Sequence, residues 1–121
     1  MAATALAEQE VLGPYVLETA TQFTTLTFTD GDDANMNSIV MSTGRCLVLF
    51  RNTDDDTAAW VTAVSSNDPH GRTADIAQED IGFGEYGAHF FEARGWEQTL
   101  GGRNLLIDVE NNTIEILAIP V

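Results

Sequence analysis

The stretch of sequence that decides the fold is 104–121, which reads NLLIDVENNTIEILAIPV. Apolar residues recur at every second position on both sides of Asn111-Asn112, and Asn tolerates the positive φ that a tight two-residue turn requires. The alternation predicts a β-hairpin in which Ile107 faces Ile116. One face of this hairpin is wholly apolar, so we expect it to be core.

The opposite face of the predicted hairpin pairs Asp108 with Glu115 and Leu106 with Leu117. Like charges directly across a ladder are destabilising, and the apolar side chains beside them are not expected to stay in water. We therefore expect a cover on this face, supplied either by the chain's own N-terminal segment or by another subunit or partner protein. In the second case the hairpin's interface residues are Leu106, Leu117, Ile119 and Val121.

The rest of the chain consists of short apolar or Thr-rich runs between clusters of Gly, Asn, Asp and Pro. A turn signal at this spacing indicates an all-β antiparallel sandwich, jelly-roll-like, with about eight or nine short strands. The expected strands are Thr21–Thr29, Asn37–Ser42, Arg45–Asn52, Ala58–Ser65, Thr73–Gln78, Gly87–Ala93, Trp96–Thr99, Asn104–Glu110 and Thr113–Val121.

Residues 1–20 differ from the remainder because they are Ala-rich and interrupted by Gly13-Pro14. We interpret them as an extended N-terminal arm, followed by a β-sandwich domain over 21–121. Arms of this kind become ordered when they lie on a neighbouring subunit, since new burial then offsets the entropy of ordering.

The run from Cys46 to Phe50 is apolar on both faces of its expected strand. A sandwich buries one face of each strand, so this strand is either central beneath a loop or close to an interface. Cys46 is expected to be a buried, inert thiol.

The amino-acid composition limits the kinds of partner that this protein is expected to bind. The 121 residues include 19 Asp or Glu, five Arg and no Lys, which gives a formal net charge of −14. Such a surface repels phosphate backbones and anionic lipid, so we expect no nucleic-acid or membrane partner. The charge indicates either adaptation to high salt, where self-repulsion is screened, or the codon bias of a GC-rich genome.

Residues that carry catalytic chemistry are sparse, and we predict no enzyme, no catalytic residue and no cofactor. His70 and His89 stand apart from any serine nucleophile motif. The acidic loops 30–33 and 54–56 lack the ligand spacing of a calcium loop, so solvated charge is the expected reading and no metal site is predicted. Trp96 and Phe83 are either core residues or interface anchors.

The segment from Arg51 to Trp96 resembles a family of small virion proteins of tailed viruses and prophages, found among head genes. The residues that carry the resemblance are Arg51-Asn52-Thr53, the loop Asp68 to Ile76, Gly84-Glu85-Tyr86, Gly95-Trp96, Gln98, Ala2 to Ala7 and Gly13-Pro14-Tyr15. Members often carry Lys where this chain has acids or Arg, which fits a virus of a high-salt host such as a haloarchaeon.

The resemblance implies a capsid decoration or related head protein, assembled in the host cytoplasm and located on the capsid exterior. It implies the major capsid protein as partner, and we expect a homotrimer. Arg72 and Asp75 are expected to form an ion pair in a loop that faces a neighbour. The alternatives are a tail or neck component and a calcium-dependent carbohydrate-binding or adhesion sandwich.

Overall fold

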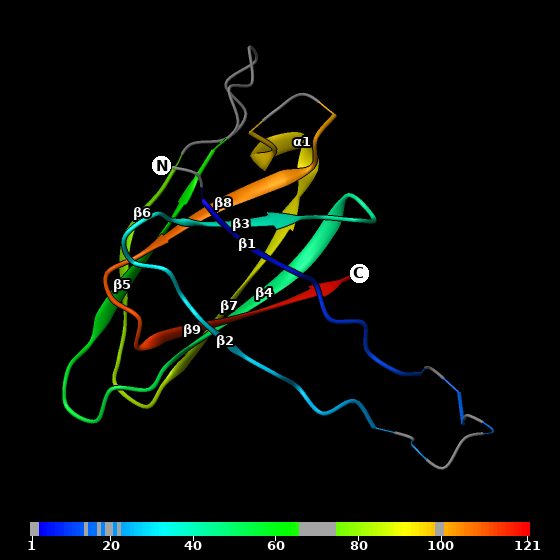
Figure 1. Ribbon diagram of the computed structural model, residues 1–121, viewed down its shortest axis with the longest axis horizontal. Helices are drawn as coiled ribbons and strands as arrows, with labels where there is room; N and C mark the ends of the chain where they lie inside the picture. Colours follow the sequence, from blue (N-terminus) through cyan, green and yellow to red (C-terminus); the bar gives the residue numbers. More distant parts are fainter. Residues whose placement is uncertain are drawn as a thin grey trace.

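The structure is a computed structural model, and it describes residues 3–13, 15–16, 18, 21, 23–65, 75–98 and 101–121. Short strands dominate the described part of the chain, together with the single-turn helix α1, Ala93–Trp96 (Figure 1). The strands are β1 Thr4–Leu6, β2 Thr29–Asp30, β3 Asn37–Val40, β4 Arg45–Asn52, β5 Ala59–Val64, β6 Ile76–Ile81, β7 Tyr86–Glu92, β8 Asn104–Val109 and β9 Ile114–Pro120.

The strands form two sheets packed face to face. The five-stranded sheet has the order β1-β3-β8-β5-β6, and the four-stranded sheet has the order β2-β9-β4-β7. Every pairing is antiparallel except that of β1 with β3. The strand order from β2 to β9 is that of a jelly roll, in which the chain passes repeatedly from one four-stranded sheet to the other. The predicted all-β sandwich is confirmed.

The predicted C-terminal hairpin is wrong, because β8 and β9 lie in different sheets. β8 pairs with β3 and β5, whereas β9 pairs with β2 and β4. Residues 110–113 carry the chain from one layer to the other, and backbone hydrogen bonds from Glu110 N to Trp60 O and from Thr53 N to Thr113 O fix this crossing. Alternation determines which face of a strand is inward, but it does not determine the neighbouring strand.

The apolar face predicted for this region is nevertheless core. Leu105, Ile107 and Val109 point inward from one sheet, and Ile114 and Ile116 point inward from the other, all 2% exposed or less. Cys46 is fully buried among them, which confirms its expected burial. The remaining members of this core are Ile39, Met41, Val48, Phe50, Ala59, Val61, Ala63, Phe91 and Ala118.

Two buried asparagines hold loops against the core. Asn37 donates from Nδ2 to the carbonyls of Asp32 and Ile107, and its Oδ1 accepts from Asp32 N. Asn52 donates to the carbonyls of Thr57 and Ile81 in the same way. Because each buried amide is hydrogen-bonded, it fixes loop geometry without a desolvation penalty.

Three predicted strands differ from the structure. Of Thr73–Gln78, residues 73–74 lie outside the described residues, and the strand begins at Ile76 as β6. Within Trp96–Thr99, Trp96 ends α1, which Glu97 N closes by donating to Ala93 O at 2.8 Å, so the strand predicted there is wrong. Among the described residues of Thr21–Thr29, only Thr29 pairs in a ladder, and residues 23–28 lie outside the sheet. No described helix is long and apolar enough to span a membrane.

Candidate assembly surfaces

A two-legged arm projects from the sandwich beside β9 (Figure 1). We define the arm as residues 7–28, of which 7–13, 15–16, 18, 21 and 23–28 are described. Gln9 links the legs: its Nε2 donates to Thr25 O at 2.7 Å and its Oε1 accepts from Thr27 N at 3.0 Å. Further out, Leu12 N donates to Thr24 Oγ1 at 2.8 Å. These bonds give the projecting segment a defined shape.

The surface of the arm is apolar. Six large apolar side chains on it are between 43% and 90% exposed: Val11, Leu12, Tyr15, Val16, Phe23 and Leu26. Its charged residues are Glu8, Glu10 and Glu18, and its sequence contains no Arg or Lys. A cluster of exposed apolar side chains on one projection is typical of a contact surface.

The base of the arm is fixed to both sheets. β1 pairs with β3, and Gln9 N donates to Ala118 O of β9 at 2.7 Å. Thr4 Oγ1 donates to the Asp32 carboxylate, which also accepts from Ala34 N and from Asn35. These hydrogen bonds, that from Thr4 above all, lower the pKa of Asp32 to about 2. The arm therefore starts from a rigid foundation.

The second surface is the outer side of the four-stranded sheet, whose centre is apolar. The register places Leu47 beside Phe90 and Ile119, and Leu49 beside Ala88 and Leu117. We call this set the outer patch: Leu47, Leu49, Ala88, Phe90, Leu117 and Ile119. Leu47, Leu49 and Ile119 are half-buried and Phe90 is 45% exposed, so the patch is partly open to solvent.

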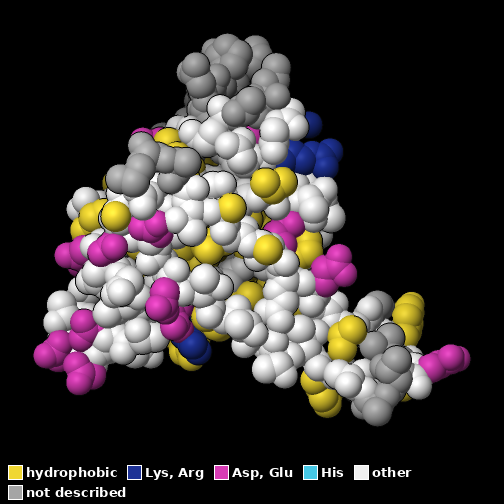
Figure 2. Space-filling view, viewed as in Figure 1, with side chains coloured by type: hydrophobic (Ala, Val, Ile, Leu, Met, Phe, Trp, Pro, Cys, Tyr) yellow, Lys and Arg dark blue, Asp and Glu magenta, His cyan; other side chains and the backbone are white. Residues whose placement is uncertain are grey.

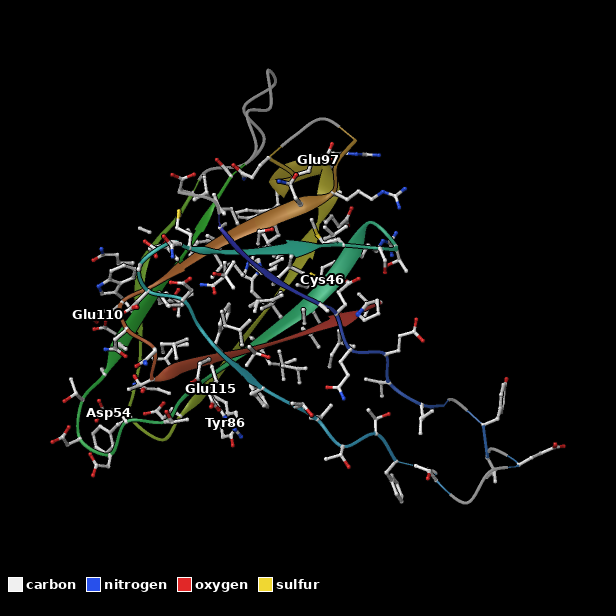
Figure 3. All side chains as sticks on the ribbon, in the orientation of Figure 1. Cys46, Asp54, Tyr86, Glu97, Glu110 and Glu115 are labelled. Carbon is white, nitrogen blue, oxygen red and sulfur yellow. The ribbon has the colours of Figure 1, made fainter. Side chains whose placement is uncertain are left out.

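Charged rows lie at both ends of the outer patch. At one end Arg45 stands opposite Glu92. At the other, Arg51 forms an ion pair with Glu115, and Phe28 lies over the Arg51 guanidinium, 4.4 Å from ring centroid to Cζ. Tyr86 meets Phe28 edge-on at 6.2 Å, and Figure 3 shows Tyr86 and Glu115 at this end. The hydrogen bond that Arg51 Nε donates to the Glu115 carboxylate raises the pKa of Arg51.

The four residues predicted as one interface do not share a surface. Leu106 is half-buried on the five-stranded sheet, opposite Ser38 and Val64. Leu117 is on the four-stranded sheet and only 3% exposed, where the base of the arm passes along β9. Ile119 is half-buried in the outer patch, and Val121 is 52% exposed.

The remaining predicted residues also separate. Asp108 stands opposite Thr62, so it does not pair with Glu115. Asp75 accepts hydrogen bonds from Ser65 N and Oγ, which lower its pKa. Its predicted partner, Arg72, lies outside the described residues. Trp96 is half-buried and packs on Phe91 with ring centroids 5.1 Å apart, and Phe83 is 56% exposed.

Charge is unevenly distributed over the sandwich. Carboxylates gather at the end formed by the loops after β2, β4, β6 and β8, which we call the acidic end (Figure 2). They are Asp32, Asp33, Asp54, Asp55, Asp56, Glu85 and Glu110. Exposed arginines Arg45, Arg94 and Arg103 lie at the other end, where Arg103 donates to Ser42 O at 2.9 Å. We call this the arginine end.

Within the acidic end, ligand oxygens of Asp54, Asp55 and Asp56 lie within 4.8 Å of one another. Asp54 Oδ1 accepts from Asp56 N at 3.1 Å, and this bond leads the causes that lower the pKa of Asp54. Asp56 Oδ1 accepts from Thr57 Oγ1 at 2.8 Å. Hydrogen bonds of the turn itself account for the clustering.

A groove of about 250 Å³ lies between β6 and β7, at the edge of the sandwich away from the arm. Its floor is apolar and includes Phe50, Val61 and Phe91. Its acidic lining residues are Glu79, Asp80 and Glu85. His89 also borders the groove and contacts Phe91, with ring centroids 4.5 Å apart.

Comparisons with models of known families, with curated proteins and with solved structures find no match. The function must therefore be inferred from the molecule's own surfaces.

Sequence reasoning recognised that the strand with Leu47 and Leu49 is apolar on both faces and close to a loop or an interface. It did not identify the outer patch as a set, because the members from β7 depend on the pairing of β4 with β7. The return leg of the arm, 23–28, has the same Thr-rich composition as a strand, so composition did not distinguish it. The segregation of charge between the two ends depends on which loops the topology brings together.

Proposed function

We propose that the protein is a structural component of a tailed-virus head, a decoration protein that binds the outside of the assembled capsid. The observation that carries this proposal is the arm, which displays six large apolar side chains on a fixed projection. Apolar area of this kind is stabilised by burial against another protein surface. A jelly roll is also a common fold of virion proteins, which supports the class of function by analogy only.

The charge distribution suggests how such a protein is oriented. A shell adapted to the same salt carries acidic surfaces, so it repels the acidic end more strongly than the arginine end, where three arginines offset Glu92 and Glu97. We propose that Arg45, Arg94 and Arg103 face the major capsid protein and that the acidic end faces solvent. Solvated carboxylates on the outside of the particle also oppose aggregation between particles.

The first experiment asks whether the protein belongs to the head. The gene is deleted from the virus or prophage that carries it, and wild-type and mutant particles are compared by mass spectrometry and by immunogold labelling. A decoration protein has a copy number close to that of the major capsid protein and labels the head. A small fraction of that copy number, with label at the neck or tail, supports the alternative instead; absence from particles overturns both.

The second experiment tests the orientation with purified heads from the deletion mutant. Arg94→Gln and Thr57→Glu each make the net charge more negative by one, and they differ only in the end of the sandwich that they alter. Added protein of each variant is titrated onto the heads at several salt concentrations. We expect weaker binding for Arg94→Gln alone. Equal loss for both variants contradicts the proposed orientation.

A calcium-dependent adhesion function gains no comparable support. The loop at 54–56 is its strongest feature, and the hydrogen bonds within that turn already explain the close carboxylates.

A further inference from the structure

We propose that the arm of one copy of this chain lies across the outer patch of a second copy. The two surfaces match in character, because six of the exposed large apolar side chains belong to the arm and Phe90, with its neighbours Leu47 and Leu49, forms an open apolar area on the sheet. Joining them removes both areas from water. The contact uses the arm that also supports the function proposed above, but it requires no other virion component, so it can be tested on the purified chain alone.

Within one copy the arm points away from this area. Its base is fixed by the hydrogen bond from Gln9 to Ala118 and by the ladder that pairs Thr29 with Ile116. From this edge of the sheet the legs run outward, beyond the sandwich (Figure 1). The six exposed apolar side chains of the arm are therefore not buried against their own outer patch, and a second copy supplies the matching surface.

The outer side of the sheet already accepts a side chain from the base of the arm. Phe28 lies on it, over the Arg51 guanidinium and against the edge of Tyr86. An aromatic ring gains both apolar burial and a cation–π contact there. The adjoining Leu47, Leu49 and Phe90 continue the same surface, so an incoming arm extends a packing arrangement that Phe28 begins.

Charge favours the outer patch over the other open surface. The arm has three glutamates and no cation, and the groove between β6 and β7 is lined by Glu79, Asp80 and Glu85, which repel it. The outer patch instead has an arginine opposite a glutamate in the row at each end, and Asp30 beside Glu115 is the one further carboxylate in these rows. At the open end, exposed Arg45 is available to a glutamate of the arriving arm.

The area is sufficient for a specific contact. Six side chains of this size present on the order of 500 Å² of apolar surface, and with the receiving face one contact buries about 1,000 Å², near the lower bound for a specific interface. The arm and the patch are different surfaces, so each copy both gives and receives an arm. Such contacts close into a ring or a reciprocal dimer, and either closure doubles the buried area per copy.

The test begins with the oligomeric state of the full chain, measured at high salt by size-exclusion chromatography with light scattering. The arm variant is Val16→Asp with Phe23→Asp, and the patch variant is Phe90→Asp. The matched control is Val40→Asp, which alters a side chain 59% exposed on the five-stranded sheet. We expect oligomers for wild type and control, and monomers for the arm and patch variants. A monomeric wild type, or equal dissociation of the control, overturns the proposal.

Disulfide trapping identifies the contact even where Phe90→Asp fails to fold. One chain carries Val16→Cys and another carries Phe90→Cys; they are mixed and oxidised. The native Cys46 does not compete, since burial raises the pKa of its thiol to about 12. We expect crosslinked pairs containing one chain of each kind, and little product from either chain alone. Crosslinking of Val16→Cys with itself as readily as in the mixture shows an arm-to-arm contact and overturns the proposal.

Discussion

The two sheets enclose one core, yet their outer sides differ. The outward residues of the five-stranded sheet mix the polar Ser38, Thr62 and Asp108 with the apolar Val40, Val64 and Leu106. The centre of the four-stranded sheet is instead apolar throughout, with Leu47, Leu49 and Phe90. A sandwich needs one apolar face on each sheet in order to fold. A second apolar face adds nothing to that core, so it identifies the side of the molecule that is suited to contact with other chains.

The sharpest test of this difference is a pair of substitutions at residues that the sequence placed opposite each other. Leu117→Ala is expected to lower the free energy of unfolding by about 2–5 kcal/mol, because Leu117 is buried. Leu106→Ala removes a half-buried side chain from the other sheet, and about 1 kcal/mol is expected. Denaturant titrations measure both values.

The double variant adds a test of topology. Residues on opposite outer sides have no shared contacts, so the two losses should add to within about 0.5 kcal/mol. A larger coupling energy indicates that Leu106 and Leu117 touch, which contradicts the separation of β8 and β9 into two sheets.

Sequence alone predicted the class of fold and the inward residues, because a period of two is a property of each strand by itself. Leu105, Ile107, Ile114 and Ile116 were predicted as core and are core. Strand neighbours are set by long-range packing, and Asn111-Asn112 favoured a local turn that the crossing between layers overrides. The return leg of the arm and the outer patch depend on those long-range neighbours, so the sequence did not predict them.

The next largest effect on the free energy of unfolding is expected in the row of charges beside the outer patch. Arg51→Met keeps most of the side-chain volume but leaves Glu115 facing Asp30 without a cation. Since Glu115 is mostly shielded from solvent and Phe28 covers the guanidinium, we expect Arg51→Met to lower the free energy of unfolding by more than a substitution at an unpaired surface arginine. Arg94→Met, at an exposed arginine on the other end, should cost less than about 0.5 kcal/mol. Equal losses would mean that Phe28 and Glu115 gain nothing from Arg51.

The effect of salt on thermal stability should differ between substitutions at the acidic end and at the arginine end. At low salt Asp55→Asn should raise the thermal midpoint by about 1 °C, because it removes one of several like charges. Glu92→Gln removes a carboxylate that faces Arg45, so it should leave the midpoint unchanged or lower it. Both differences should disappear at high salt, where charges are screened. Scanning calorimetry at two salt concentrations measures both midpoints. If the two variants change the midpoint equally, the uneven distribution of charge between the ends is contradicted.

The smallest expected effect concerns the attachment of the arm. The pKa of Asp32 is lowered to about 2, so its contribution to stability is present above pH 4 and is lost as the pH falls toward 2. Thr4→Val removes the main hydrogen bond and should raise this pKa toward 3.8. An NMR titration of the carboxyl group measures the change, with Thr57→Val as a distant control. An unchanged pKa shows that Thr4 does not hold Asp32.

The pairing of β2 with β9 places one of the first strands of the chain beside the last. During synthesis, the segments on either side of the arm therefore have no complete sheet to join until β9 has left the ribosome. Folds built from such distant pairings form slowly, in milliseconds to seconds for small β-domains. The arm consequently acquires its fixed base only after β9 has been synthesised.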